Sequence, residues 1–217
     1  MSLTIKIKNN HWTLLPERAL FWKEKKTLIA GDLHLGKSGH FRKSGIAAPQ
    51  QINQTNLDRL ERLVHQLQPE RLLLLGDLFH SDYNREWFPF EEWCTKHPDL
   101  KKILVAGNHD TLHETLYRQA GLDIHEEFID GAFEFNHKPA GSADKLVNFR
   151  FCGHIHPGVK LKGKGRQSLR LPCFYREKHQ MILPAFGEFT GLHLLVTDDA
   201  ECIYTIANRK VVSLKEN

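Results

Sequence analysis

The sequence predicts an α/β fold built on two stacked β-sheets flanked by helices. Three observations lead to this fold class. Apolar, β-prone runs recur along the whole 217-residue chain, from LTIKIK near its start to CIYTIA near its end. Helical patterns separate these runs up to about residue 120, whereas the later part is rich in strands. Because this length suits one hydrophobic core, we expect a single domain over residues 1–217.

Three helices are expected in the first part of the chain. The clearest lies in QINQTNLDRLERLVHQL, where apolar side chains recur at helical spacing and Pro69 ends the segment. The apolar stripe consists of Ile52, Leu57, Leu60, Leu63, Val64 and Leu67. A second helix is expected in REWFPFEEWCTKH, with Pro89 as an interruption. A third begins near Thr111 and ends before Gly121.

The remaining apolar runs are predicted strands. In chain order they are ALFW, TLIAGD, LLLLGD, ILVAGN, AFEF, NFRFCGH, LRLPCFY, MILPAF, LHLLV and CIYTIA. Two segments rich in glycine and basic residues, 36–48 and 157–170, are expected to be long loops.

The composition is that of an ordinary soluble globular protein, with 41% hydrophobic and 26% charged residues. No apolar stretch approaches the roughly 18 to 20 residues that span a bilayer, and MSLTIKIKNN lacks the apolar core of a signal peptide. We therefore expect a cytoplasmic protein that binds no membrane. The four cysteines are far apart and form no CxxC, which disfavours a zinc knuckle or a disulfide scaffold. A net charge of +4 permits an anionic partner without demanding one.

Metal-competent side chains follow four of the apolar runs. TLIAGDLH, LLLLGDLFH, ILVAGNHD and NFRFCGHIH each read as a strand, a glycine and then a polar cluster. The clusters contain Asp32, His34, Asp77, His80, Asn108, His109, Asp110, His154 and His156. Ligands collect beyond the carboxyl ends of strands in open α/β sheets, so these four endings can converge on one place. Each glycine would let the chain turn sharply and approach an ion closely.

This mixture of carboxylates, an amide oxygen and imidazoles suits manganese, iron or zinc better than calcium. One aspartate can bridge two cations, and two divalent ions would leave the site positive enough to attract phosphate. The alternative is a set of unrelated structural histidines. The ordered series GDxH, GDxxH, GNHD, GHxH argues against it, whereas the pair Asp123 and His125 has no accompanying cluster and is read as surface or core.

The ordered series over residues 31–156 resembles the calcineurin-like metallophosphoesterases. The resemblance implies an α/β/β/α two-sheet sandwich with a dinuclear metal centre. It implies that one metal is held by Asp32, His34, Asp77 and His156. The other would be held by Asp77, Asn108, His154 and a further histidine. His113 and His125 are available for that place, but we favour His137, because it follows an apolar run as in the family's motif.

The same resemblance suggests catalytic roles for three residues. His109 matches the position near the leaving group, where it would act as general acid and protonate the departing oxygen, while the attacking water is activated by the two metals. Asp110 would either orient His109 or cap the following helix. GDLFHS, with His80, is similar to the SbcD-type DNA repair nucleases, which implies a histidine that supports the centre or contacts phosphate; the alternative is a bond to nearby backbone. No serine or cysteine nucleophile is required.

A closer resemblance covers most of the chain. GDLHLGKSGHFRKSGIAAP, GDLFHSDYNREW and GHIHPGVKLKGKGRQSLRLPCF are similar to the PdeM family of ligase-associated DNA damage response endonucleases. It implies a DNA endonuclease with two divalent ions, Mn²⁺ or alternatively Fe²⁺ or Zn²⁺, in a repair pathway with a DNA ligase, a nuclease and a helicase. Two rival functions are a small-nucleotide or cyclic-nucleotide phosphodiesterase and a non-catalytic, nucleic-acid-binding subunit of a repair complex.

Basic residues near the first and last motifs are candidate phosphate contacts. They are Lys37, His40, Arg42, Lys43, Lys160, Lys162, Lys164, Arg166 and Arg170. Such groups neutralise phosphates without reading sequence, although glycine-interspersed lysines also occur in solvated hairpins. Tyr83, Trp87 and Phe88 would favour single-stranded or looped DNA if they stack on unpaired bases; packing in the core is the alternative.

Overall fold

The first β-sheet turns from antiparallel to parallel along its width. The computed structural model describes residues 1–37, 52–80, 83–141, 144, 147–163, 165, 167–188 and 190–215. Within these ranges the sheet consists, in spatial order, of β1 (Leu3–Ile7), β2 (Asn10–Leu15), β3 (Ala19–Trp22), β4 (Thr27–Ala30), β5 (Arg71–Leu75), β6 (Lys101–Val105) and β7 (Leu122–His125). Strands β4 to β7 are parallel, so their carboxyl ends lie at one edge.

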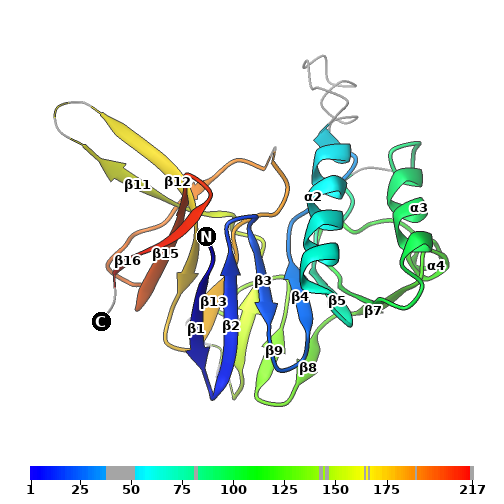
Figure 1. Cartoon of the computed structure of the whole chain (residues 1–217), viewed down its shortest axis with the longest axis horizontal. Helices are drawn as coiled ribbons and strands as arrows, with labels where there is room; N and C mark the ends of the chain where they lie inside the picture. Colours follow the sequence, from blue (N-terminus) through cyan, green and yellow to red (C-terminus); the bar gives the residue numbers. More distant parts are fainter. Residues whose placement is uncertain are drawn as a thin grey trace.

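The second sheet is mixed and stacks against the first (Figure 1). Its strands are β8 (Phe128–Asp130), β9 (Phe133–Phe135), β10 (Phe149–Cys152), β11 (Pro157–Lys162), β12 (Ser168–Arg176), β13 (Gln180–Ile182), β14 (His193–Leu194), β15 (Cys202–Ala207) and β16 (Lys210–Lys215). Strand β10 lies between β9 and β13 and is parallel to both. The end of β10 therefore comes from the middle of this sheet.

An aromatic core holds the two sheets together. Trp12 of β2 stacks on Trp22 of β3 at 4.7 Å between ring centroids, and it contacts Phe151 of β10 at 4.2 Å. Phe133 of β9 meets the edge of Trp12 at 4.8 Å. These four rings are almost completely buried. Large aromatic surfaces contribute strongly to burial energy, so they fix the spacing of the sheets.

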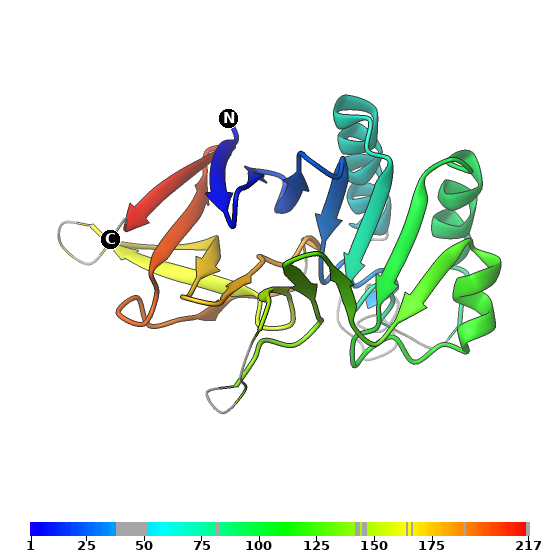
Figure 2. The same ribbon diagram turned by 90° about the horizontal axis from the view of Figure 1, so that it is seen from below.

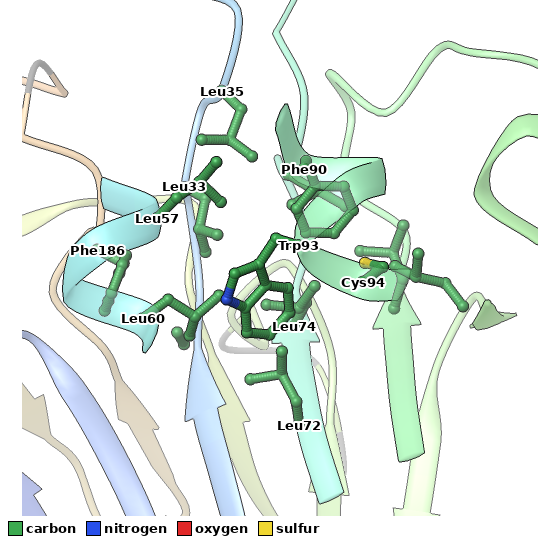
Figure 3. Packing of buried hydrophobic residues seen from close by; sticks show 14 of the residues in the cluster. Leu33, Leu35, Leu57, Leu60, Leu72, Leu74, Phe90, Trp93, Cys94 and Phe186 are labelled. Atoms are coloured by element: carbon green, nitrogen blue, oxygen red, sulfur yellow. The ribbon is translucent and has the colours of Figure 1, made fainter. Parts of the chain in front are cut away.

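Three helices cover the outer face of the first sheet: α2 (Ile52–Leu67), α3 (Phe88–Lys96) and α4 (Glu114–Gln119) (Figure 2). Figure 3 shows Leu72 and Leu74 of β5 beneath Leu60 of α2 and Trp93 of α3. Pro89 was expected to interrupt the second helix, and this expectation is wrong. It lies in the first turn of α3, where a missing backbone N–H costs no helical hydrogen bond.

The predicted two-sheet α/β fold is confirmed, with a difference in its layers. All helices in the described ranges pack on the first sheet, and no helix there covers the outer face of the second. That face instead carries a smaller apolar cluster that includes Cys152, Cys173 and Ala200. The described chain after β10 consists mainly of strands and their connections.

Residues 157–170 form most of a β-hairpin rather than the expected long loop. Strands β11 and β12 are antiparallel, with Lys160 opposite Arg170 and Leu161 opposite Leu169. Apolar and basic residues alternate with a period of two, which is typical of a strand. The hairpin extends away from the helices (Figure 1). Among the described residues, no helix is long and apolar enough to cross a membrane.

Replacing Leu74 by alanine should destabilise the protein by about 2 to 5 kcal/mol, because the side chain is fully buried between β5 and the helices. Urea unfolding followed by circular dichroism measures this change. The matched control is Leu169→Ala on the hairpin, where the leucine is 55% exposed and the expected change is below about 0.5 kcal/mol. Equal destabilisation by both substitutions would contradict this description of the core.

Candidate metal centre

The ends of four strands, three from the first sheet and one from the second, bring the predicted polar clusters together. Asp32 follows β4, Asp77 follows β5, Asn108 follows β6 and His154 follows β10. Backbone bonds connect the first two turns, since Asp32 N–H donates to the Gly76 carbonyl at 3.0 Å and His34 N–H donates to the Asp77 carbonyl at 2.8 Å. The turns after β4 and β5 are therefore joined directly to each other.

The backbone is strained at five of the expected ligands. Each has a left-handed φ, between 48° and 69°, which non-glycine residues seldom adopt. These residues are Asp32, His34, Asp77, His154 and His156. Such conformations persist only where the surroundings impose them, and they gather at functional sites. The strained backbone therefore points to the same edge of the sheet as the metal-competent side chains do, and it is a separate observation from their chemistry.

The glycines before the clusters mainly provide space. At Gly76, with φ at +70°, a Cβ atom would collide with the imidazole of His137. At Gly153 a Cβ atom would lie 2.5 Å from Oδ2 of Asp32. The predicted close approach is confirmed, whereas most of the turning occurs at the aspartates and histidines that follow.

Asp32, His34 and His156 form the first group. Their potential ligand atoms all lie within 4.8 Å of one another. Nε2 of His34 is 3.2 Å from Nε2 of His156, and the latter atom is 3.4 Å from Oδ1 of Asp32. The three donors thus surround a common point, as expected of ligands to one ion.

Asp77, His137 and His154 form the second group, within the same distance limit. Nε2 of His137 lies 3.1 Å from Nδ1 of His154 and 3.4 Å from Oδ1 of Asp77. The amide oxygen of Asn108 is 3.1 Å from the same Nε2 atom and adds a fourth donor. His113 instead caps α4 and His125 pairs with Asp123, so neither reaches this group.

The carboxylate of Asp77 faces both groups. Its Oδ1 atom lies near His137, whereas its Oδ2 atom lies 3.7 Å from Nε2 of His34. Asp77 is 2% exposed and its Oδ1 atom accepts a 2.9 Å hydrogen bond from the backbone N–H of His109. One carboxylate with an oxygen toward each group can bridge two cations.

Three histidines have a hydrogen-bond partner on the ring nitrogen that faces away from the centre. Nδ1 of His137 donates to the Leu75 carbonyl and Nδ1 of His156 donates to the Thr190 carbonyl, both at 3.0 Å. These bonds leave an Nε2 lone pair on each ring for a metal. Nδ1 of His34 lies 3.1 Å from Nδ1 of His80, in a hydrogen bond for which either ring can be the donor. No sequence motif indicated the two carbonyl partners.

The electrostatics of the centre favour a bound cation. Burial, followed by the charge of Lys37, lowers the pKa of His34 to about 2, and burial also lowers the pKa of His154. Burial opposes protonation of His156 as well, but the hydrogen bond and charge of Asp32 outweigh it and raise its pKa. Buried carboxylates and mostly neutral imidazoles with facing lone pairs leave negative charge that a divalent ion would compensate. The donor set fits two divalent ions.

The three predicted catalytic residues lie close to the groups but differ in their contacts. The ring of His109 packs on that of His80 at 3.9 Å between centroids. Asp110 neither orients His109 nor caps α4 through any hydrogen bond in the described ranges. It accepts backbone N–H groups from Leu78 and Phe79 on Oδ1 and from Gly107 on Oδ2. Asp110 therefore braces the turn after β5 against the turn after β6.

The predicted phosphate contacts are spread over different parts of the molecule. Burial lowers the pKa of Lys37, and the charges of Asp77 and Asp32 oppose this effect in part. Lys37 is therefore close to the centre. Lys160, Lys162 and Arg170 are exposed on the hairpin, whose first residue directly follows His156. At about 3.3 Å per residue, the strand carries Lys162 roughly 20 Å away from His156. His40, Arg42, Lys43, Lys164 and Arg166 lie outside the described residues.

The aromatic residues after His80 have different environments. Trp87 is fully buried against Phe79 and Phe90 and belongs to the core. Tyr83 and Phe88 are 48% and 49% exposed and touch edge to face. Only these last two have rings that an unpaired base can reach.

The chain is similar to known proteins in sequence and in structure. The chain matches the family described as calcineurin-like phosphoesterase over residues 25–177. A comparison with curated proteins gives no match. The solved structure of Pseudomonas putida nuclease MPE is similar, with 29% identity, a TM-score of 0.83 and coverage of 99% of this chain and 100% of that one.

Two further solved structures are more distant. The Escherichia coli phosphoesterase Yfce has 13% identity and a TM-score of 0.49, over 88% of this chain and 99% of its own. The Aquifex aeolicus protein of unknown function AQ665 has 19% identity and a TM-score of 0.42, over 64% and 82%. The family match spans well over half of the chain and contains the strand-end motifs from Asp32 to His156. The chain therefore belongs to the calcineurin-like phosphoesterases and is a metallophosphoesterase, a hydrolase with a centre of the dinuclear type.

Proposed function

We propose that the protein is a DNA endonuclease that depends on two divalent ions, with Mn²⁺ preferred. The observation that carries this proposal is the carboxylate of Asp77, which faces two groups of metal-competent side chains. The likeness to a nuclease along nearly the whole of both chains supports a nucleic-acid substrate.

The proposed ligands follow from the distances given above. One ion would be held by Asp32, His34, Asp77 and His156, and the other by Asp77, Asn108, His137 and His154. Bound divalent ions would supply a hydroxide nucleophile at neutral pH and neutralise charge on the phosphodiester. The chain's own task is to hold these donors rigidly, which the buried aspartates and the carbonyl-anchored histidines do.

His109 is the proposed general acid that protonates the departing oxygen of the DNA. Its backbone N–H is tied to Asp77, and its ring packs on His80, so its position is fixed relative to the centre. His80 would support both His109 and His34, because it contacts both rings. Asp110 has an indirect role, because it braces the turns that carry Asp77 and Asn108.

The basic residues and two aromatic rings support a preference for single-stranded or looped DNA. Lys37 would contact phosphate at the centre, and Lys160, Lys162 and Arg170 would contact the strand farther away, without reading its sequence. Tyr83 and Phe88 are exposed and suited to stacking on bases that a duplex would conceal. We place this activity in DNA repair in the cytoplasm, with a ligase, a nuclease and a helicase, on the resemblance to the PdeM family.

Purified protein with Mn²⁺ should cut circular single-stranded DNA, because an endonuclease needs no free end. Gel electrophoresis of the circle, of linear duplex, of RNA and of cyclic nucleotides measures the preference, with Mg²⁺ and Zn²⁺ as alternative metals. Turnover of cyclic nucleotides without any cutting of the circle would contradict the proposal and favour a small-nucleotide phosphodiesterase. Equal cutting of single strands and linear duplex would remove the strand preference.

The substitution His109→Gln should lower kcat on DNA by about 10² to 10⁴, the usual contribution of a general acid. The loss should be much smaller on bis(p-nitrophenyl) phosphate, because nitrophenolate leaves without needing a proton. Steady-state kinetics on both substrates make this comparison. His65→Gln, at an exposed position on α2, is the control. Equal losses on the two substrates would show that His109 does not protonate the leaving group.

Removing divalent ions should lower the melting temperature, and adding Mn²⁺ should restore it. Ions at 100 times their dissociation constant stabilise the folded state by about 2.7 kcal/mol per site. Asp77→Asn should abolish most of this gain, since the amide cannot bridge two cations. Differential scanning fluorimetry compares it with Asp123→Asn, which alters the other Asp-x-His pair. A full gain of stability in Asp77→Asn would contradict the bridging role.

A further inference from the structure

A cleft of about 710 Å³ lies beside the metal centre and carries a cluster of arginines. It is bounded by the turn between β2 and β3, by α2, by the middle of β12 and by the turn between β15 and β16. The charged residues of its lining are Arg18, Arg59, Arg62, Arg209, Glu17 and Glu188. Four positive and two negative side chains leave an excess of two positive charges.

Two of these arginines occupy positions where an arginine is costly. Arg18, in the β2–β3 turn, has φ at 66°, and Arg209, in the β15–β16 turn, has φ at 57°. Glycine or asparagine is the usual residue at such hairpin positions. Two separate hairpins thus place a guanidinium on the same cleft against the preference of the backbone.

The buried floor of the cleft contains a third arginine. Arg59 is 8% exposed, although a charged side chain is seldom buried to this degree. Its Nη1 donates to Glu188 at 3.3 Å and its Nη2 donates to the carbonyl of Phe186, while its Nε has no hydrogen-bond partner among the described residues. The nearby carboxylates therefore do not accept hydrogen bonds from all of the guanidinium N–H groups in the cluster.

The arginine charges also act on one another. Burial, followed by the charges of Arg18 and Arg62, lowers the pKa of Arg59 to about 10 against the opposing effect of Glu188 and Glu17. Guanidinium groups this close repel one another, and an anion between them would relieve the repulsion.

The cleft is connected to the metal centre through a single residue. Arg18 Nη1 donates to the Gly187 carbonyl at 3.2 Å, and Gly187 N–H donates to the Asp32 carbonyl at 3.0 Å. The arginine cluster is thus two hydrogen bonds from the backbone of a proposed ligand.

We propose that this arginine cleft binds phosphate groups of the substrate strand that flank the cleaved bond. The inference rests on the proposed nuclease function and assigns it a second contact region, apart from the basic residues identified in the sequence. The planar fork of a guanidinium matches two phosphate oxygens and stays charged at every working pH. Such contacts bind the phosphate backbone and do not depend on the base sequence.

The test is a double variant, Arg62→Ala with Arg209→Ala. Both side chains are exposed, and the substitution leaves in place the bonds of Arg18 and Arg59 to residues 186–188. The KM for a single-stranded oligonucleotide should rise about tenfold with kcat unchanged, and the salt dependence should weaken by about 0.7 in slope for each lost phosphate contact. Kinetics on bis(p-nitrophenyl) phosphate should not change, since that substrate is too small to reach the cleft.

The control is Arg118→Ala, which removes one arginine from α4, beside β7 at the edge of the first sheet. An unchanged KM for the oligonucleotide would overturn the proposal, as would an equal loss on both substrates, which would indicate a disturbed centre. Calorimetry with inorganic phosphate separates a free anion from a strand. If the double variant loses phosphate binding but keeps the KM for the oligonucleotide, the cleft binds a free anion and not the phosphates of a DNA strand.

Failure of the proposed function gives a different result. If the unsubstituted protein hydrolyses the small diester but cuts no DNA, the nuclease proposal fails. Fluorescence anisotropy of a labelled oligonucleotide then measures the cleft directly. Binding weakened about tenfold in the double variant would still support a phosphate-binding cleft, and unchanged binding would overturn it.

Discussion

The bridging position of Asp77 is the constraint on which the rest of the centre depends. Its two oxygens lie toward two different groups of donors, and they do so because the residue has a left-handed backbone directly after a buried parallel strand. Neighbouring turns hold this conformation: His109 N–H binds Oδ1, and Asp110 fixes the amides of the two residues that follow Asp77. The strain at Asp77 is supported by bonds from the turn after β6.

Rigid packing beneath the turns makes this strain sustainable. The leucines of β5 are fully buried between the helices on one face and the aromatic core on the other. Residues 186–188 and Thr190 add support from the second sheet, since Arg59 and Arg18 hold the backbone of 186 and 187 while the Thr190 carbonyl orients His156. The arginine cleft and the metal centre therefore share a wall, which couples the proposed binding of flanking phosphates to the geometry of one ligand.

Much of the fold and the place of the site could be predicted from the sequence. Strand-end motifs are local patterns, and the parallel strands β4 and β5 bring their ends together, so the proximity of Asp32 and Asp77 follows from the pattern. The stacking of the second sheet on the first brings His154 to them. What could not be predicted depends on contacts between distant segments. No sequence motif indicates that the Thr190 carbonyl binds His156 or that Asp110 braces two turns. The same holds for the cleft that Arg18, Arg59 and Arg209 share. The hairpin at 157–170 was missed because its glycines and lysines are typical of loops.

Anomalous X-ray diffraction from crystals grown in Mn²⁺ tests the central role of Asp77 most directly. We expect two peaks about 3.5 to 4 Å apart, one near Oδ1 and the other near Oδ2 of Asp77. A single peak, or two peaks with both oxygens of Asp77 bound to the same ion, would contradict the bridging carboxylate.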